Sequence, residues 1–169
     1  MGRGARALEG LVRRPNPAFW SGRKVLLTGH TGFKGAWAAR MLAALGARVT
    51  GFALEPLPGA VTFAAMGVAG GLARDLRCDL RQADQLCSAV HGADVVLHLA
   101  AQSIVSEGFR DPAETWGVNL TGTLTLLQAL RGANIQAAVI VTSDKVYRNQ
   151  GGRAFVEDDS LGGDDPYSA

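Results

Sequence analysis

The sequence lacks the marks of several classes of protein. It has only two cysteines in 169 residues, Cys78 and Cys87, and neither has a histidine or a second cysteine at metal-ligand spacing. No apolar run approaches the roughly 18 residues of a membrane helix, and the basic N-terminus has no apolar signal segment. We therefore expect no metal site, two free and mostly buried thiols, and a soluble protein of the reducing cytoplasm.

Excess charge of one sign is also scarce. The formal net charge is +2. Much of it comes from four arginines that precede the first strand pattern, Arg3, Arg6, Arg13 and Arg14. A nucleic-acid partner would need a clustered basic face, which the pattern does not show. The 47% of hydrophobic residues suffice for one domain with a core. We expect a loose leader over residues 1–18 and one domain over residues 19–169, a transit peptide being the less favoured interpretation of the leader.

Short apolar segments alternate with helical patterns along the rest of the chain. Strands are expected at residues 24–28, 48–52, 73–78, 94–100 and 138–142. Helices are expected after the first strand up to Gly46, near residues 63–66, at residues 82–90, and from Pro112 to about Gly132. Two apolar stripes at helical spacing support the first and last helices: Trp37, Met41 and Leu45, and Leu120, Leu124, Leu127 and Leu130. This alternation predicts an α/β fold, a doubly wound parallel sheet that binds ligands at the carboxyl ends of its strands.

A glycine-rich segment joins the first strand to the first helix. In that context Gly29 permits a tight turn, Gly32 lets backbone N–H groups approach a pyrophosphate, and Gly35 lets the helix pack closely on the strand. The segment therefore predicts a dinucleotide-binding, Rossmann-like domain, the alternative being an ordinary glycine turn. The cofactor-binding residues expected here are Gly29, Thr31, Gly32, Phe33, Lys34 and Gly35.

Two acidic residues follow the next two strands. Glu55 lies about 20 residues past the last glycine, where an acidic side chain holds the adenosine ribose hydroxyls and would repel a 2′-phosphate, favouring NAD over NADP. Asp79, followed by Leu80, is placed to accept a hydrogen bond from the adenine amino group. The alternatives are an exposed loop glutamate for Glu55 and a solvated helix cap for Asp79.

Several motifs together resemble the extended short-chain dehydrogenase/reductase superfamily and, within it, the NAD-dependent epimerase/dehydratase family. They are the glycine segment from Thr28, Leu99-Ala100-Ala101-Gln102, Asn119 with Gly122-Thr123, and Pro166-Tyr167-Ser168. More narrowly, this chain resembles the enzymes that dehydrate CDP-glucose. The resemblance lies in Phe19-Trp20, in His30 of the glycine segment, in Thr142-Ser143-Asp144-Lys145 and in Gly163 through Ser168. Ser143-Asp144-Lys145 is the most specific element, because related dehydratases usually carry Thr-Asp-Glu there.

The resemblance implies 4,6-dehydration of a nucleotide sugar, CDP-glucose before others, with NAD as cofactor. Tyr167 would take the proton of the sugar 4′-hydroxyl, for which a tyrosine needs a nearby cation at neutral pH. Asp144 would protonate the leaving 6′-hydroxyl, Lys145 would act as the base at C5′, and Ser143 would position the substrate. The resemblance adds Leu99, Ala100, Ala101, Asn119 and Thr142 to the cofactor site.

Each catalytic assignment has a structural alternative. Asp144 and Lys145 also fit a solvated pair in a loop, and Tyr167 fits a residue that caps or packs the next helix. His30 falls within the phosphate loop and is assigned no proton transfer. His98 is typical of a satisfied core histidine, and His91 of a surface residue.

The sequence departs from the family in two places. After Gln102 the family usually continues with an arginine and a tyrosine, whereas residues 106–109 are Ser, Glu, Gly and Phe, so the reaction class is better supported than the sugar. The sequence also ends at Ala169, before the lysine of Tyr-x-x-x-Lys. The resemblance therefore implies a fragment, truncated before the last strands and the substrate domain, inactive alone and a homodimer at full length. The rivals are an epimerase or reductase of the superfamily and a noncatalytic NAD-binding module.

Overall fold

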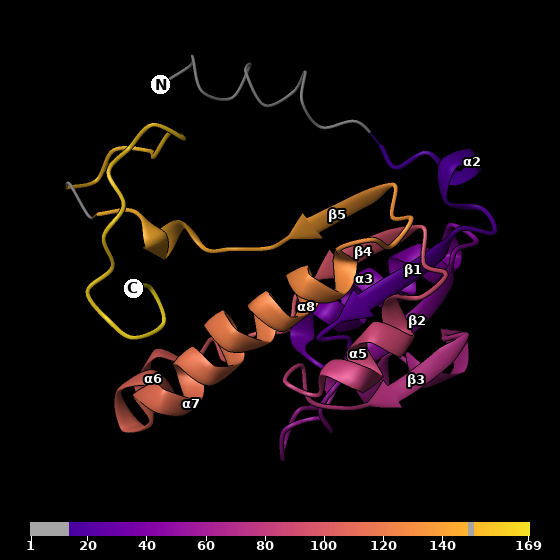
Figure 1. The fold of residues 1–169 in the computed structure, drawn as a ribbon, viewed down its shortest axis with the longest axis horizontal. Coiled ribbons are helices and arrows are strands. Elements are labelled where there is room, and N and C mark those ends of the chain that lie inside the picture. Colours follow the sequence, from indigo (N-terminus) through magenta and orange to yellow (C-terminus); the bar gives the residue numbers. More distant parts are fainter. Residues whose placement is uncertain (1–13, 149–150) are drawn as a thin grey trace.

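The computed structural model, which describes residues 14–148 and 151–169, contains one parallel sheet of five strands (Figure 1). The strands are β1 Lys24–Thr28, β2 Arg48–Ala53, β3 Arg74–Arg77, β4 Val95–His98 and β5 Ala137–Ile140, in the spatial order β3-β2-β1-β4-β5. Each lies where the sequence predicts a strand, although β4 and β5 end two residues early. The predicted doubly wound α/β fold is therefore confirmed.

The described helices are α2 Pro17–Trp20, α3 Phe33–Ala44, α4 Thr62–Ala65, α5 Ala83–Val90, α6 Val105–Arg110, α7 Pro112–Trp116 and α8 Thr123–Leu130, with 3₁₀ turns η1 Ala69–Gly71 and η3 Asp144–Val146 and a π-helical segment η2 Gly117–Gly122. Of these helices, α3 and α4 pack on one face of the sheet, and α5 and α8 pack on the other. Of all these elements, α2, α6, η1 and η3 were not expected from the sequence. No helix within the described ranges is both long and apolar enough to cross a membrane. Residues 1–13, most of the expected leader, lie outside the described residues, so the leader boundary stays a prediction.

The central strand β1 is buried on both faces, as its sequence predicts. Val25 and Leu27 pack with α3 and α4 on one face, whereas Leu26 packs with α5 and α8 on the other. Alternate side chains of a strand point to opposite faces, so one strand contributes to both halves of the core.

The apolar stripes correctly indicated two helices, but they do not face the core. On α3, Trp37 is 58% and Met41 49% exposed, and the buried residues are Gly35, Ala36, Ala39 and Leu42. Small side chains let the helix approach the sheet, which leaves the bulky ones outside. On the last helix Leu120, Leu124 and Leu127 are exposed, and Leu126 is buried instead.

The last helix is a continuous run of α7, η2 and α8. It begins as predicted, with Asp111 accepting a hydrogen bond from the Glu114 N–H (2.9 Å) and Pro112 in the first turn. The π-helical segment η2 widens the turn and changes which side chains face the core from there on. The helix therefore does not keep one phase of apolar residues along its length.

The prediction of mostly buried thiols is wrong for one cysteine. Both are free, but Cys87 on α5 is exposed and Cys78 is only partly buried. The neighbouring Leu86 faces the core, and the next position along a helix points elsewhere.

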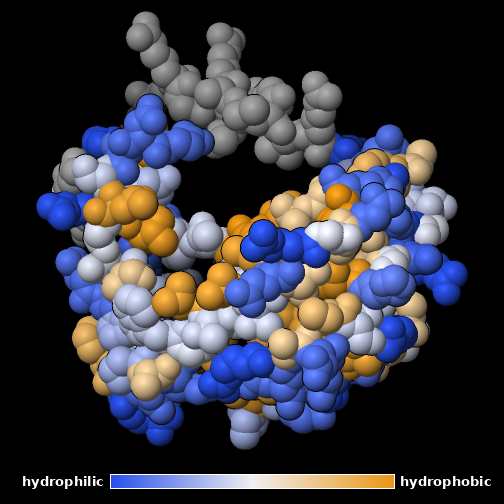
Figure 2. All heavy atoms as spheres, in the orientation of Figure 1, coloured by the Kyte–Doolittle hydropathy of each residue, from blue (hydrophilic) through white to orange (hydrophobic). Residues whose placement is uncertain are grey.

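Apolar surface is exposed at the edge strand β5. Val139 of this strand is 49% exposed, and apolar surface gathers around the hollow between the sheet and the C-terminal segment (Figure 2).

A buried chain of three side chains ties β1 and β4 to α8. The Thr28 hydroxyl accepts hydrogen bonds from the N–H groups of Leu99 and Ala100, both at 3.2 Å, and lies 2.7 Å from His98 Nδ1. With both lone pairs engaged, the hydroxyl donates its proton to Nδ1. His98 then carries its own proton on Nε2 and donates it to Thr123 Oγ1 at 3.0 Å. The expectation of a satisfied core histidine is confirmed.

His98 should make the stability of the chain depend on pH. Burial lowers the pKa of His98 from 6.5 to about 4. Between these values the unfolded chain binds the proton and the folded chain does not, so stability falls as pH decreases from 6.5 towards 4. The loss in free energy of unfolding should reach about 3 kcal/mol at the lower end of this pH range, from roughly 1.4 kcal/mol per pKa unit.

Urea unfolding at a series of pH values measures this effect. We expect His98→Gln to be less stable at neutral pH and to show a flatter decline in acid. His91→Gln, which changes an exposed histidine, is the matched control. An unchanged slope in His98→Gln would contradict the assignment of this histidine as buried and neutral.

Candidate active site

The glycine segment forms a tight loop between β1 and α3. Gly29 adopts a positive φ of 74°, and a Cβ there would lie 2.7 Å from the Ala100 nitrogen. A Cβ on Gly35 would overlap the Gly29 carbonyl oxygen. Gly32 differs, because the nearest atom to its Cβ would be 3.4 Å away, and the residue is exposed. The protein itself therefore requires Gly29 and Gly35, whereas Gly32 leaves open space at the start of α3.

That open space has the properties of an anion site. Gly32 is the N-cap of the 12-residue helix α3 and makes no side-chain capping hydrogen bond. The first N–H groups of a helix point outwards and carry its positive dipole end. Phe33 is 69% exposed and Lys34 is exposed, so neither residue buries the first N–H groups of α3 against the core. The geometry fits a pyrophosphate at the helix end.

The two polar side chains of the loop point into the protein. His30 is fully buried, and its Nε2 donates to Asp75 Oδ1 at 2.9 Å. Burial lowers the pKa of His30 although Asp75 opposes this effect. A Cβ on Gly51 would lie 2.6 Å from the His30 ring, so glycine at that point of β2 makes room for the imidazole. Thr31 Oγ1 donates to the Leu54 carbonyl oxygen at 3.0 Å.

The acidic residues after β2 and β3 lie at the same edge of the sheet. Glu55 is 75% exposed at its side chain, with Oε2 at 3.4 Å from Arg77 Nη1. Asp79 is bonded by Arg81, whose guanidinium also pairs with Glu114 of α7. The hydrogen bond from Arg81 lowers the pKa of Asp79. Asp79 is therefore ionised and partly occupied by Arg81.

Asn119 and Gln102 hold the segment after β4 against the last helix. The Gln102 N–H donates to Asn119 Oδ1 at 2.8 Å, and Asn119 Nδ2 donates to the Gln102 carbonyl at 2.9 Å. This pair fixes the backbone of the residues between β4 and Gln102, where Leu99, Ala100 and Ala101 lie. Leu80, by contrast, is buried in the core against Gly122, so only its backbone is available to a ligand.

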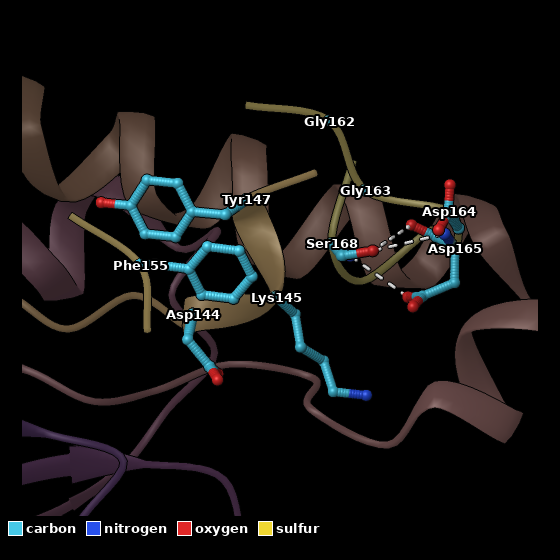
Figure 3. Close-up of a pocket in the computed structure, with 9 residues that line it drawn as sticks. All are labelled: Asp144, Lys145, Tyr147, Phe155, Gly162, Gly163, Asp164, Asp165 and Ser168. Atoms are coloured by element: carbon cyan, nitrogen blue, oxygen red, sulfur yellow. Dashed lines mark hydrogen bonds between the residues drawn. The ribbon is translucent and has the colours of Figure 1, made fainter. Parts of the chain in front are cut away.

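The predicted acid and base share one pocket after β5. Asp144 and Lys145 form η3, where Ser143 Oγ accepts from the Lys145 N–H at 3.2 Å, and Thr142 lies exposed just before. The pocket holds about 310 Å³ and is lined by Asp144, Lys145, Tyr147, Phe155, Gly162, Gly163, Asp164, Asp165 and Ser168. In Figure 3 the two side chains diverge, with stacked aromatic rings on one side and Ser168 with Asp165 on the other.

Tyr167 lies in a separate hollow. Its neighbours there are Trp116, Asn119, Leu120, Pro166 and Ala169. Asp165 caps the turn by accepting from the N–H groups of Tyr167 (2.8 Å) and Ser168 (3.2 Å), and Ala169 N–H donates to the Asp165 carbonyl. The structure therefore brings Asp144 and Lys145 together and places Tyr167 beside Asn119.

Two features of the pocket were missed in the sequence. The rings of Tyr147 and Phe155 stack at 5.1 Å between centroids, and no local pattern reveals that pairing. The cap at Asp165 had a signal, because Asp165-Pro166 repeats the Asp111-Pro112 pattern that predicted the long helix. Among the described residues no group of three metal-binding side chains occurs.

The sequence of this chain is similar to those of known proteins. A family model described as "NAD dependent epimerase/dehydratase family" matches residues 25–169. The CDP-glucose 4,6-dehydratase of Salmonella typhimurium is 37% identical over 157 residues, covering 89% of this chain and 43% of the relative. The chain thus spans less than half of that relative's length.

Solved structures give the same result for the fold. A dTDP-glucose 4,6-dehydratase of Streptomyces venezuelae, with NAD bound, superposes with a TM-score of 0.75 at 27% identity, over 86% of this chain and 47% of that one. A UDP-glucose 4-epimerase of Stenotrophomonas maltophila, also with NAD, has a TM-score of 0.74 at 29% identity, over 86% of this chain and 44% of that one. NAD is therefore the cofactor of this fold, and the open cradle at Gly32 fits it.

From the open space at Gly32 we predict the effect of one substitution on cofactor binding. Gly32→Val would place a branched side chain where the pyrophosphate approaches the helix, and we expect NAD affinity to fall at least about tenfold, the loss of one charge-assisted contact or more. Calorimetric titration of NAD measures the change. Gly70→Val, at a glycine whose Cβ would meet nothing within 4 Å, is the matched control. Unchanged NAD affinity in folded Gly32→Val would exclude this phosphate site.

Proposed function

This chain belongs to the NAD-dependent epimerase/dehydratase family, and from that premise we propose that it forms the cofactor-binding part of a nucleotide-sugar 4,6-dehydratase. The proposed reaction converts CDP-glucose into CDP-4-keto-6-deoxyglucose and water. The observation that carries the proposal is the pairing of Asp144 with Lys145 in one pocket at the carboxyl end of β5. The Salmonella relative supports the choice of CDP-glucose.

The chemistry requires an acid and a base on neighbouring atoms of the sugar. Oxidation at C4′ to a ketone makes the C5′ hydrogen acidic, and we propose that Lys145 removes that proton. Asp144 donates a proton to the 6′-hydroxyl, which leaves as water while the C5′–C6′ double bond forms. NAD, when held at the glycine turn, would supply the hydride acceptor for C4′ and the hydride donor for C6′, and Lys145 would give the proton back to C5′, so that no net redox change occurs.

Tyr167 is proposed to take the proton of the 4′-hydroxyl. Asp165 supports this role by holding the backbone of Tyr167 and Ser168 in a turn beside the pocket. Ser143 and Thr142 lie next to the acid and base and are proposed to orient the sugar. The proposed cofactor contacts are Gly29, Thr31, Gly32, Phe33, Lys34, Gly35, Glu55, Asp79, Leu80, Leu99, Ala100, Ala101, Asn119 and Thr142. Thr31, Asp79 and Asn119 are also bonded within the protein, so their contribution includes holding the backbone.

The nearest alternative is an epimerase or a reductase of the same family. The likeness to a UDP-glucose 4-epimerase makes this alternative concrete. An epimerase has no elimination step and so no need for the pair of Asp144 and Lys145, which favours the dehydratase. A noncatalytic NAD-binding module would not need Tyr167 and that pair together.

We also propose a cytoplasmic homodimer. Four large apolar side chains of the last helix are exposed to solvent: Trp116, Leu120, Leu124 and Leu127, by 45%, 57%, 50% and 44%. Exposed large apolar side chains gathered on one helix are typical of a protein interface. The two free cysteines agree with a reducing compartment.

The catalytic proposal is tested with Asp144→Asn and Lys145→Ala in the full-length gene product. Both variants should bind NAD normally and lose most of the 4-keto-6-deoxy product, by about 10²-fold or more, as is usual for a lost general acid or base. Only Lys145→Ala should also stop the exchange of the C5′ hydrogen with deuterated water. Product is followed by the absorbance of the 4-keto sugar in alkali.

Controls come from the same segment and from the opposite, amino end of the strands. Asp158→Asn removes a carboxylate outside the pocket, and Lys24→Ala removes a lysine at the amino end of β1. Near-normal turnover by Asp144→Asn or Lys145→Ala would remove that residue from the mechanism. Formation of CDP-galactose instead of the keto sugar would identify the epimerase.

A further inference from the structure

Arg77 is held at the carboxyl end of β3 by two contacts on its own side of the sheet. Its Nη2 donates to Asp75 Oδ2 at 2.7 Å, and its guanidinium lies over the Phe63 ring at 4.7 Å. A planar guanidinium that is both bonded and stacked has little freedom to move. In register, Arg77 pairs with Ala53, the last residue of β2, so it stands directly beside the strand end that precedes Glu55.

The second terminal nitrogen of the guanidinium, Nη1, is buried and makes no hydrogen bond within the described residues. Its nearest anionic partner is Glu55, with Oε2 at 3.4 Å, and the Glu55 side chain is 75% exposed. An ion pair with so exposed a partner is weak. The fixed arginine therefore offers a donor that a single exposed carboxylate, that of Glu55, screens.

The pair of Arg77 and Glu55 lies where this type of fold binds the adenosine ribose of a dinucleotide. In open α/β sheets that bind dinucleotides, the adenosine ribose reaches the end of the second strand. An acidic residue there binds the 2′-hydroxyl of NAD, whereas an arginine nearby accommodates the 2′-phosphate of NADP. This chain carries both groups within 3.4 Å of each other.

We propose that Arg77 is a latent 2′-phosphate site that Glu55 masks, so that this one ion pair sets the choice between NAD and NADP. The proposal rests on NAD binding and not on the dehydration chemistry. It gives Arg77 a role in cofactor specificity beyond bracing Asp75.

The local charge explains why the site is closed in the native chain. Arg77 contributes +1, and Asp75 and Glu55 together −2, leaving −1 around the ribose position. The adjoining His30 is neutral because burial lowers its pKa. A 2′-phosphate adds nearly two negative charges at neutral pH and would be repelled. Replacing Glu55 by glutamine brings the local charge to zero and frees Arg77 Nη1 for the phosphate.

A double-mutant cycle on this chain tests the proposal. NAD and NADP are titrated into the native chain, Glu55→Gln, Arg77→Gln and the double variant. The native chain should prefer NAD. Glu55→Gln should raise NADP affinity by about tenfold to a hundredfold, the range of one or two charge-assisted hydrogen bonds. The double variant should lose that gain, because its source is the arginine.

Two controls separate specificity from general charge and from structure. Glu157→Gln makes the same charge change on an exposed glutamate far along the chain, and Arg74→Gln changes an exposed arginine at the amino end of β3. Neither should alter the ratio of NADP to NAD affinity, and Arg74→Gln combined with Glu55→Gln should keep the gain. If Arg77→Gln does not fold, Arg77→Lys replaces it, and the gain should shrink because a lysine lacks the two-pronged geometry.

The outcomes are distinct. No gain in NADP affinity for Glu55→Gln, or a gain that survives Arg77→Gln or is undiminished in Arg77→Lys, would overturn the latent site while leaving NAD binding intact. A native chain that binds neither cofactor would overturn the cofactor assignment and this inference together. If the native full-length protein does not dehydrate CDP-glucose, but the variants show the expected ratios of NADP to NAD affinity, the result would count against the proposed reaction alone.

Discussion

The carboxyl edge of this sheet depends on one hydroxyl proton. Thr28 receives two backbone N–H groups on its oxygen and so has only its own proton to offer His98. That donation fixes the imidazole tautomer and directs the other ring nitrogen to Thr123. The end of β1, the segment after β4 and the start of α8 are thereby joined beside the proposed cofactor site.

Local pattern was sufficient where backbone geometry alone decides the outcome. Gly29 and Gly46 both adopt the positive φ that their turns require, and Gly35 meets the carbonyl that only a glycine tolerates. The five strands and the Asp111-Pro112 helix start follow from short-range rules of the same kind. The fold and the tight glycine turn between β1 and α3 were therefore predictable from the sequence.

Local pattern was not sufficient for partners that the strand order brings together. His30 and Asp75 are 45 residues apart, and Glu55 meets Arg77 only because β2 and β3 pair in a particular register. Helical periodicity identified Trp37 and Leu124 as parts of stripes, but amphipathicity does not say which surface covers a stripe. The position of Tyr167 apart from Asp144 depends on the cap at Asp165, whose Asp-Pro signal is in the sequence but whose position beside the pocket is not.

The contact between His30 and Gly51 constrains how this segment can evolve. The imidazole occupies the volume that any side chain at position 51 would need, and it is bonded to Asp75 from that position. An alanine at position 51 would displace the ring, and a smaller residue at position 30 would leave a void beneath the phosphate loop. Neither change is neutral alone, so descendants that replace one must pass through a less stable intermediate or change both. The two positions should therefore be inherited as a unit, although they lie on different elements of the fold.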